Sequence, residues 1–142
     1  MKTNTDEVAK AISELIPSVI QGGQLQFLSE STVTHSQFLL LAAVHARTGC
    51  SMSDLAQNMH IRMPTATGLV DRLVQSGFIE RVHSSSDRRK VVVCLTPKGE
   101  GFIKGFKKTI QVRWSDVLKK LSKNELMQMY GIVTKLKTEL QK

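Results

Sequence analysis

The sequence has few of the residues from which disulfide-bonded or membrane-spanning proteins are built. Its two cysteines, Cys50 and Cys94, form no CxxC motif and no disulfide framework, which favours a reducing compartment. No apolar run approaches the roughly 18 residues that a membrane span needs, and the N-terminus lacks the apolar stretch of a signal peptide. We therefore expect a cytoplasmic protein with no membrane partner.

Residues for catalysis or metal binding are equally sparse. The four histidines are scattered, with no HxxxH spacing and no acidic partner at helical spacing, so no metal site is predicted. The chain has no nucleophile elbow, no phosphate-binding loop and no paired carboxylates in an apolar context. We expect neither an enzyme nor a bound cofactor. At 142 residues the chain is long enough for one domain with a real core.

Positive charge is in excess, and it is unevenly distributed. The formal net charge is +8, which favours a polyanionic partner. Residues 1–59 hold three Lys and Arg against five Asp and Glu, whereas residues 60–98 hold seven against three. Residues 99–142 hold ten against four. The basic part of the sequence therefore begins near residue 60.

Two short helical patterns separated by a turn lie in this region. The first is expected to be capped by Ser53 and to run from Asp54 to Met59, before a turn over residues 60–63. The second starts with Pro64, whose missing N–H costs nothing in a first turn, and ends at Ser76–Gly77. Its apolar stripe is Ala66, Leu69, Val70 and Leu73. The opposite, groove-accessible face carries Pro64, Thr67, Gly68, Asp71 and Gln75, with Arg72 at its edge.

Two β-rich runs follow directly, over residues 78–83 and 91–95, and they flank the basic insert Ser84–Lys90. Polar and basic residues between two such runs predict a hairpin with a cationic tip. A helix, a turn, a second helix and a basic hairpin together predict a winged helix-turn-helix. That arrangement indicates DNA binding.

The flanking segments are predicted to be helical. Residues 7–28 have helical apolar spacing, but Pro17 should kink them and Gly22–Gly23 should end or loosen them, leaving one imperfect helix or two short ones. Thr34 and Gln37 form a capping box that opens a buried helix.

Two more helices are expected near the C-terminus, starting at Thr96–Pro97 and at the capping box Ser122–Glu125. The apolar stripes of the first and last helices are too long to be buried in one small lobe. They predict the core of a dimer.

Three motifs follow one another in order: Leu69–Leu73 with Gly77–Arg81, then Asp87–Arg89, then Leu95–Gly99. Together they resemble the MarR (multiple-antibiotic-resistance regulator) family of bacterial winged-helix transcription factors, and the resemblance covers essentially the whole chain. It implies a mainly α fold with a small β-hairpin wing, in one domain over residues 1–142. Residues 34–95 would form the DNA-binding lobe, and residues 1–32 and 97–142 the dimerisation helices. The expected function is that of a homodimeric regulator, a repressor, on a pseudo-palindromic operator in double-stranded DNA.

The resemblance also assigns roles to single residues. Arg88 and Arg89 match wing-tip arginines that reach the minor groove, and Asp87 matches an aspartate that pairs with a recognition-helix arginine, here Arg72. A narrow minor groove concentrates negative potential, and Arg is less strongly hydrated than Lys when it enters. The expected DNA-binding residues are Arg62, Met63, Pro64, Thr65, Thr67, Arg72, Asp87, Arg88, Arg89 and Lys90.

Two positions depart from the family pattern. Arg62 stands where Ser or Asp usually caps the recognition helix, and Gly68 stands where an arginine is common. A glycine offers no hydrogen bond to a base edge. Selectivity is therefore expected from DNA shape and from contacts of Met63, Thr65 and Thr67 with thymine methyl groups.

Two alternatives stay open: a winged-helix module that binds another protein, and a redox-responsive regulator that uses Cys50 or Cys94. Inert packing is favoured for both thiols, because no adjacent charge is placed to stabilise a thiolate. The family resemblance also implies release of DNA by a small anionic or phenolic effector, although no constellation of residues identifies such a site.

Overall fold

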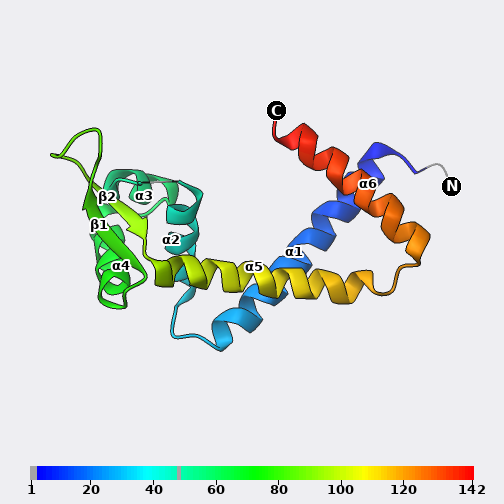
Figure 1. Ribbon diagram of the computed structural model, residues 1–142, viewed down its shortest axis with the longest axis horizontal. Helices are drawn as coiled ribbons and strands as arrows, with labels where there is room; N and C mark the ends of the chain where they lie inside the picture. Colours follow the sequence, from blue (N-terminus) through cyan, green and yellow to red (C-terminus); the bar gives the residue numbers. More distant parts are fainter. Residues whose placement is uncertain (1–2, 48) are drawn as a thin grey trace.

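The computed structural model describes residues 3–47 and 49–142; Met1, Lys2 and Thr48, which fall within the predicted ranges, lie outside the described residues. The elements are α1 (Thr5–Ser29), α2 (His35–Ala46), α3 (Met52–Asn58), α4 (Met63–Gln75), β1 (Ile79–His83), β2 (Val91–Leu95), α5 (Pro97–Leu118) and α6 (Lys123–Leu140). Figure 1 shows a lobe, which contains α2, α3, α4 and the hairpin, and an arm, in which the longer helix α1 crosses α5 and α6. A mainly α fold with a small hairpin wing was predicted, and it is confirmed.

The core lies in the lobe. Its centre is aliphatic, and α4 contributes Ala66, Val70 and Leu73, all with 0% exposure. The hairpin adds Ile79 and Val93 to the same cluster. Each of the larger side chains contributes about 1.5–3 kcal/mol by leaving water. None of the helices in the described part of the chain is long and apolar enough to cross a membrane.

Side-chain caps fix where most helices begin. The predicted capping boxes at Thr34 and Ser122 are present. The predicted cap of α3 was wrong, because Ser51 rather than Ser53 accepts the N–H of Asp54, at 3.1 Å. Asp54 lies three residues after Ser51 and accepts the Ser51 N–H in return, which completes a capping box that Ser53 has no acid to form.

The first segment is one continuous helix, α1, that runs through Pro17 and both glycines. Pro17 lies on an exposed stretch, where water can hydrate the carbonyl that loses its donor. A Cβ on Gly22 would overlap the Arg113 guanidinium, and one on Gly23 would overlap the Ile110 side chain. The two glycines therefore let α5 approach α1 closely and do not end the helix.

The chain leaves α4 through a glycine in the left-handed region and enters the hairpin. Gly77 has φ of +80°. The N–H of Gly77 donates to Val74 and that of Phe78 donates to Leu73, both at 3.0 Å, which satisfies the last carbonyls of the helix. The strands then pair antiparallel from Ile79 opposite Leu95 to His83 opposite Val91. This confirms the helix stop predicted at Ser76–Gly77.

A compact junction ties the end of α4 to the start of α5; we call residues 76–78 and 96–99 the α4–α5 junction. Lys98 donates from Nζ to the Ser76 carbonyl at 2.6 Å and stands 4.4 Å from the centroid of the Phe78 ring. Thr96 caps α5 by accepting the N–H of Gly99. A Cβ on Gly99 would overlap the carbonyl oxygen of Phe78, so only glycine fits there.

We predict that Gly99→Ala lowers the free energy of unfolding by about 1–3 kcal/mol, because the added carbon forces backbone apart in a packed contact. Gly101→Ala, two residues further along α5, is the matched control. A Cβ there meets no atom within 4 Å, so alanine should raise stability by up to about 1 kcal/mol. Urea titration of both variants measures the difference, and equal midpoints would contradict the close contact.

Candidate nucleic-acid interface

The predicted site residues fall into two exposed groups, one on α4 and one on the loop between the strands. All are exposed except Asp87, which is half-buried. The first group is Arg62, Met63, Pro64, Thr65, Thr67 and Arg72, and the second is Asp87, Arg88, Arg89 and Lys90. α4 lies beside the hairpin at the edge of the lobe, and the loop projects from the end of the hairpin (Figure 1).

The start of α4 differs from the other helix starts. Of the six helices in the described residues, α4 alone has no side-chain cap, because its N-cap is Arg62. Its first-turn N–H groups carry the positive end of the helix dipole and are not occupied by a side-chain oxygen. An anionic oxygen from outside the protein can bind there, and the Arg62 guanidinium adds a second donor.

The loop at the end of the hairpin is a hydrogen-bonded turn. The Ser84 N–H donates to the Lys90 carbonyl at 2.8 Å, and the Lys90 N–H donates to the Asp87 carbonyl at 3.0 Å. The Asp87 carboxylate accepts the Arg89 N–H at 3.0 Å. Arg88, Arg89 and Lys90 are exposed, and none of them forms an ion pair within the residues that the structure describes. The turn therefore presents three uncompensated cations to solvent.

The ion pair predicted between Arg72 and Asp87 is wrong. The Asp87 carboxylate instead holds the turn at the tip, and the acid on α4 that pairs with the hairpin is Asp71, which binds Arg81 on β1. The Asp71–Arg81 pair therefore joins α4 to the middle of β1 and braces the hairpin against the helix. Arg72 is left with an exposed side chain.

A spacing argument would have found the pair that does form. The chain reverses at Gly77, which is six residues after Asp71 and four residues before Arg81. At about 1.5 Å per helical residue and about 3.3 Å per strand residue, Asp71 lies about 9 Å and Arg81 about 13 Å from the turn, a difference that the long arginine side chain can span. Opposite charges on α4 and β1 at these positions are therefore within reach of each other.

Both thiols are free; Cys50 is buried and Cys94 is half-buried. Cys50 is 2% exposed, and its Sγ is 3.4 Å from the carbonyl oxygen of Arg47. Burial, and secondarily the nearby Asp54 carboxylate, raise the pKa of the Cys50 thiol. Its reactive thiolate form is thus disfavoured at neutral pH, which is the property of a packing residue rather than of a redox sensor.

An exposed helix after a short turn, joined to a braced hairpin with a cationic tip, defines a winged helix-turn-helix protein. Comparison with known proteins gives the family. The MarR family model matches residues 33–91. The HTH-type transcriptional repressor MdtR of Bacillus subtilis is 31% identical over 121 residues, a match that covers 82% of this chain and 76% of that protein. The chain belongs to the MarR family of helix-turn-helix transcriptional regulators.

Two further comparisons agree. The HTH-type transcriptional regulator YfiV of Bacillus subtilis is 34% identical over 94 residues, which covers 66% of this chain and 59% of that protein. The transcriptional regulator Tm0710 from Thermotoga maritima has the same fold, with a TM-score of 0.86 at 22% identity over 96% of each chain. The family resemblance predicted from the three sequence motifs is confirmed.

The Asp71–Arg81 pair should contribute little to stability. The two side chains are 53% and 34% exposed, so water screens their attraction. A double-mutant cycle with Asp71→Asn and Arg81→Gln should give a coupling energy of about 0.2–1 kcal/mol that shrinks as salt is added. A coupling energy indistinguishable from zero at low salt would contradict the expected stabilisation by this pair.

Cys50 should resist thiol reagents in the folded protein. Because its pKa is raised, the thiol stays protonated at pH values where an ordinary cysteine begins to ionise, and its burial blocks access. Labelling at about pH 8, near the ordinary cysteine pKa, with a chromogenic disulfide reagent should leave Cys50 unmodified until denaturant is added. Rapid labelling of Cys50 under native conditions would revive the redox alternative.

Proposed function

We propose that the protein is a homodimeric repressor that binds a pseudo-palindromic operator in double-stranded DNA. The observation that carries this proposal is the pairing of an open, uncapped recognition helix with three unpaired cations on a braced wing. Such a helix fits the major groove, and the arginines of such a wing fit the neighbouring minor groove. Membership of a family of transcriptional regulators supports the same function.

We assign the contacts by chemistry. Arg88 and Arg89 enter the minor groove, where their weakly hydrated guanidinium groups meet concentrated negative potential. Lys90 and Arg62 bind phosphates, and Arg62 does so together with the free N–H groups at the start of α4. Met63, Pro64, Thr65, Thr67 and Arg72 face the major groove, and Asp87 acts indirectly by shaping the turn that carries the arginines.

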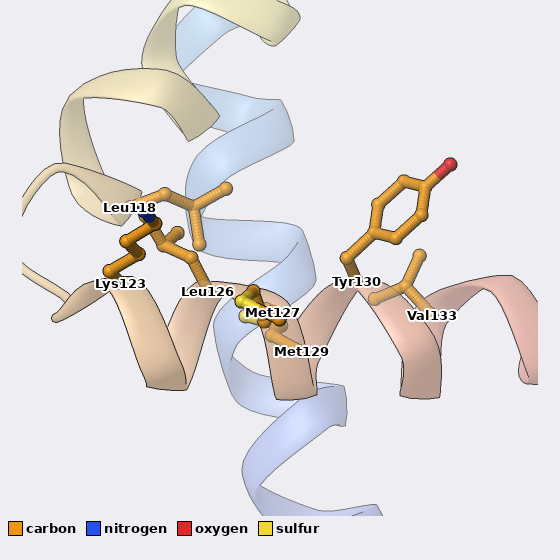
Figure 2. Close-up of a pocket in the computed structure, with 7 residues that line it drawn as sticks. All are labelled: Leu118, Lys123, Leu126, Met127, Met129, Tyr130 and Val133. Carbon is orange, nitrogen blue, oxygen red and sulfur yellow. The ribbon is translucent and has the colours of Figure 1, made fainter.

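The dimer is supported by apolar surface that one chain leaves uncovered. No residue of α6 is buried, although Tyr130 and Val133 are large and apolar and are 76% and 50% exposed. An open hollow of about 600 Å³ is lined by Leu118 at the end of α5 and by side chains of α6 that include Met127, Tyr130 and Val133. Figure 2 shows these side chains. This hollow lies on the arm, away from α4 and the wing. We interpret it as surface that the second subunit covers.

In the resulting dimer, the two lobes would bind one face of the duplex about 34–36 Å apart, which is one turn of DNA. Repression is proposed because MdtR is named a repressor. A cavity of about 370 Å³ between α1 and α5 is lined by Lys108 and Arg113 and also by the acidic Asp116. Its size and its excess of one positive charge fit the small anionic or phenolic effector that we include in the proposal.

Replacing Arg88 and Arg89 together with alanine should abolish operator binding, because the wing then has no guanidinium group to place in the minor groove. Operator duplex selected from random DNA would be titrated by fluorescence anisotropy at several salt concentrations. The slope of log affinity against log salt should shrink by about 0.9 for each phosphate that the wing no longer neutralises. Light scattering should give the mass of a dimer for the parent and for the variant.

The matched control removes two exposed cations from the arm by Lys119→Ala and Lys120→Ala. This variant has the same net charge as the wing variant and should bind the operator within about twofold of the parent. Equal weakening in both variants would mean that total charge, and not the wing, drives binding. A parent protein that binds no duplex at any salt would favour the protein-interaction alternative.

A further inference from the structure

The middle of the outward face of α4 is a glycine that the fold does not require. Gly68 lies inside the helix and has no positive φ. A Cβ added there meets no atom within 4 Å, so a larger residue would fit. Glycine in a helix interior destabilises the helix relative to alanine. Neither backbone conformation nor packing within the chain explains why this residue is glycine. The remaining explanation is a partner that contacts the outward face of α4.

The long hydrogen-bond donors of α4 stand at its two ends. Arg62 precedes the first turn, and Arg72 and Gln75 are in the last turn and a half. Asp71, also on the outward face, is held by Arg81. Between these ends the exposed side chains are Met63, Pro64, Thr65 and Thr67, which present mainly carbon to solvent. The segment expected to read base edges is thus short, carbon-rich and without a bidentate donor.

The dimensions of a helix and of the major groove show how the missing side chain at Gly68 affects docking. Side chains give a helix a diameter of roughly 10–12 Å around a backbone of radius about 2.3 Å, and the major groove is about 12 Å wide. A helix whose outward face recedes to the backbone at its centre can sit deeper than one with a full side chain there. The groups that then meet the groove floor are methyl and ring carbons. The apolar group on that floor is the C5-methyl of thymine.

We propose that Gly68 is a specificity-determining residue that lets α4 approach the major-groove floor, where Met63, Pro64, Thr65 and Thr67 select thymine methyl groups. The inference rests on the proposed function, because it concerns how the same helix reads DNA. The proposal predicts that the half-site has A·T pairs at the positions under the first two turns of α4. These pairs would be recognised by contact with carbon rather than by hydrogen bonds.

The first test removes the methyl groups and nothing else. Half-sites selected from random duplex DNA should contain thymine under α4. Replacing those thymines by uracil should weaken binding by about fourfold for each methyl group removed. Uracil in the spacer between the half-sites should leave binding unchanged. Equal affinity for thymine and uracil half-sites, or selected half-sites made only of G·C pairs, would overturn the inference while leaving DNA binding itself intact.

The second test separates the effect of Gly68 on operator affinity from its effect on stability. Gly68→Ala should raise the urea midpoint, because alanine favours the helix, and yet weaken operator binding by roughly tenfold, because its methyl group holds α4 away from the groove floor. Gly101→Ala is the control, because it also adds a methyl group in open space on a helix. This variant should be more stable than the parent and should bind the operator with unchanged affinity. Parental affinity in Gly68→Ala would overturn the proposal, and failure of the parent to bind any duplex would overturn the proposed function with it.

Discussion

The surfaces assigned to DNA depend on the burial of one stripe of α4. Ala66, Val70 and Leu73 are wholly removed from water, and Val70 and Leu73 belong to one cluster with Ile79 and Val93 of the hairpin. Because successive helical residues are about 100° apart, burying this stripe turns the residues between its members outward. The same cluster positions the hairpin, so the recognition helix and the wing share one core. A mutation that loosens it would disturb both at once.

The lobe keeps its charges and polar side chains at the surface. In the described residues no charged or polar side chain is buried, and no buried side-chain nitrogen or oxygen lacks a hydrogen-bond partner. Folding therefore leaves Arg88 and Arg89 without a partner in the core, and within the described part of the chain the ion pair between the wing and α4 is that of Asp71 and Arg81. Charge on this face is available to a partner because folding does not use it.

Much of the lobe could be predicted from the sequence because its signals are local. The period of the apolar residues in α4, the glycine stop at Gly77 and the capping box at Thr34 each involve residues a few positions apart. Except for the cap of α3, which lies at Ser51 and not at Ser53, the predictions that failed concern contacts between different segments. Gly22 and Gly23 were expected to end or loosen the helix. Their role in the structure is to make room for Arg113 and Ile110, which lie about 90 residues away in the sequence. The partner of Asp71 depends on how far a helix and a strand rise from their common turn. The cationic wing was predicted correctly, whereas the ion pair was assigned to Arg72 and Asp87, although the spacing of Asp71 and Arg81 from Gly77 favours the pair that forms.

The α4–α5 junction has a mechanical consequence. Lys98 and Gly99 hold the first turn of α5 against the end of α4 and the start of β1, so we expect this connection to be rigid. Helix α5 has 22 residues and is about 33 Å long. At that length, a shift of about 3 Å at its far end turns the whole lobe by roughly 5°, recognition helix and wing together. We therefore expect a displacement at the far end of α5 to reach the lobe as a rotation.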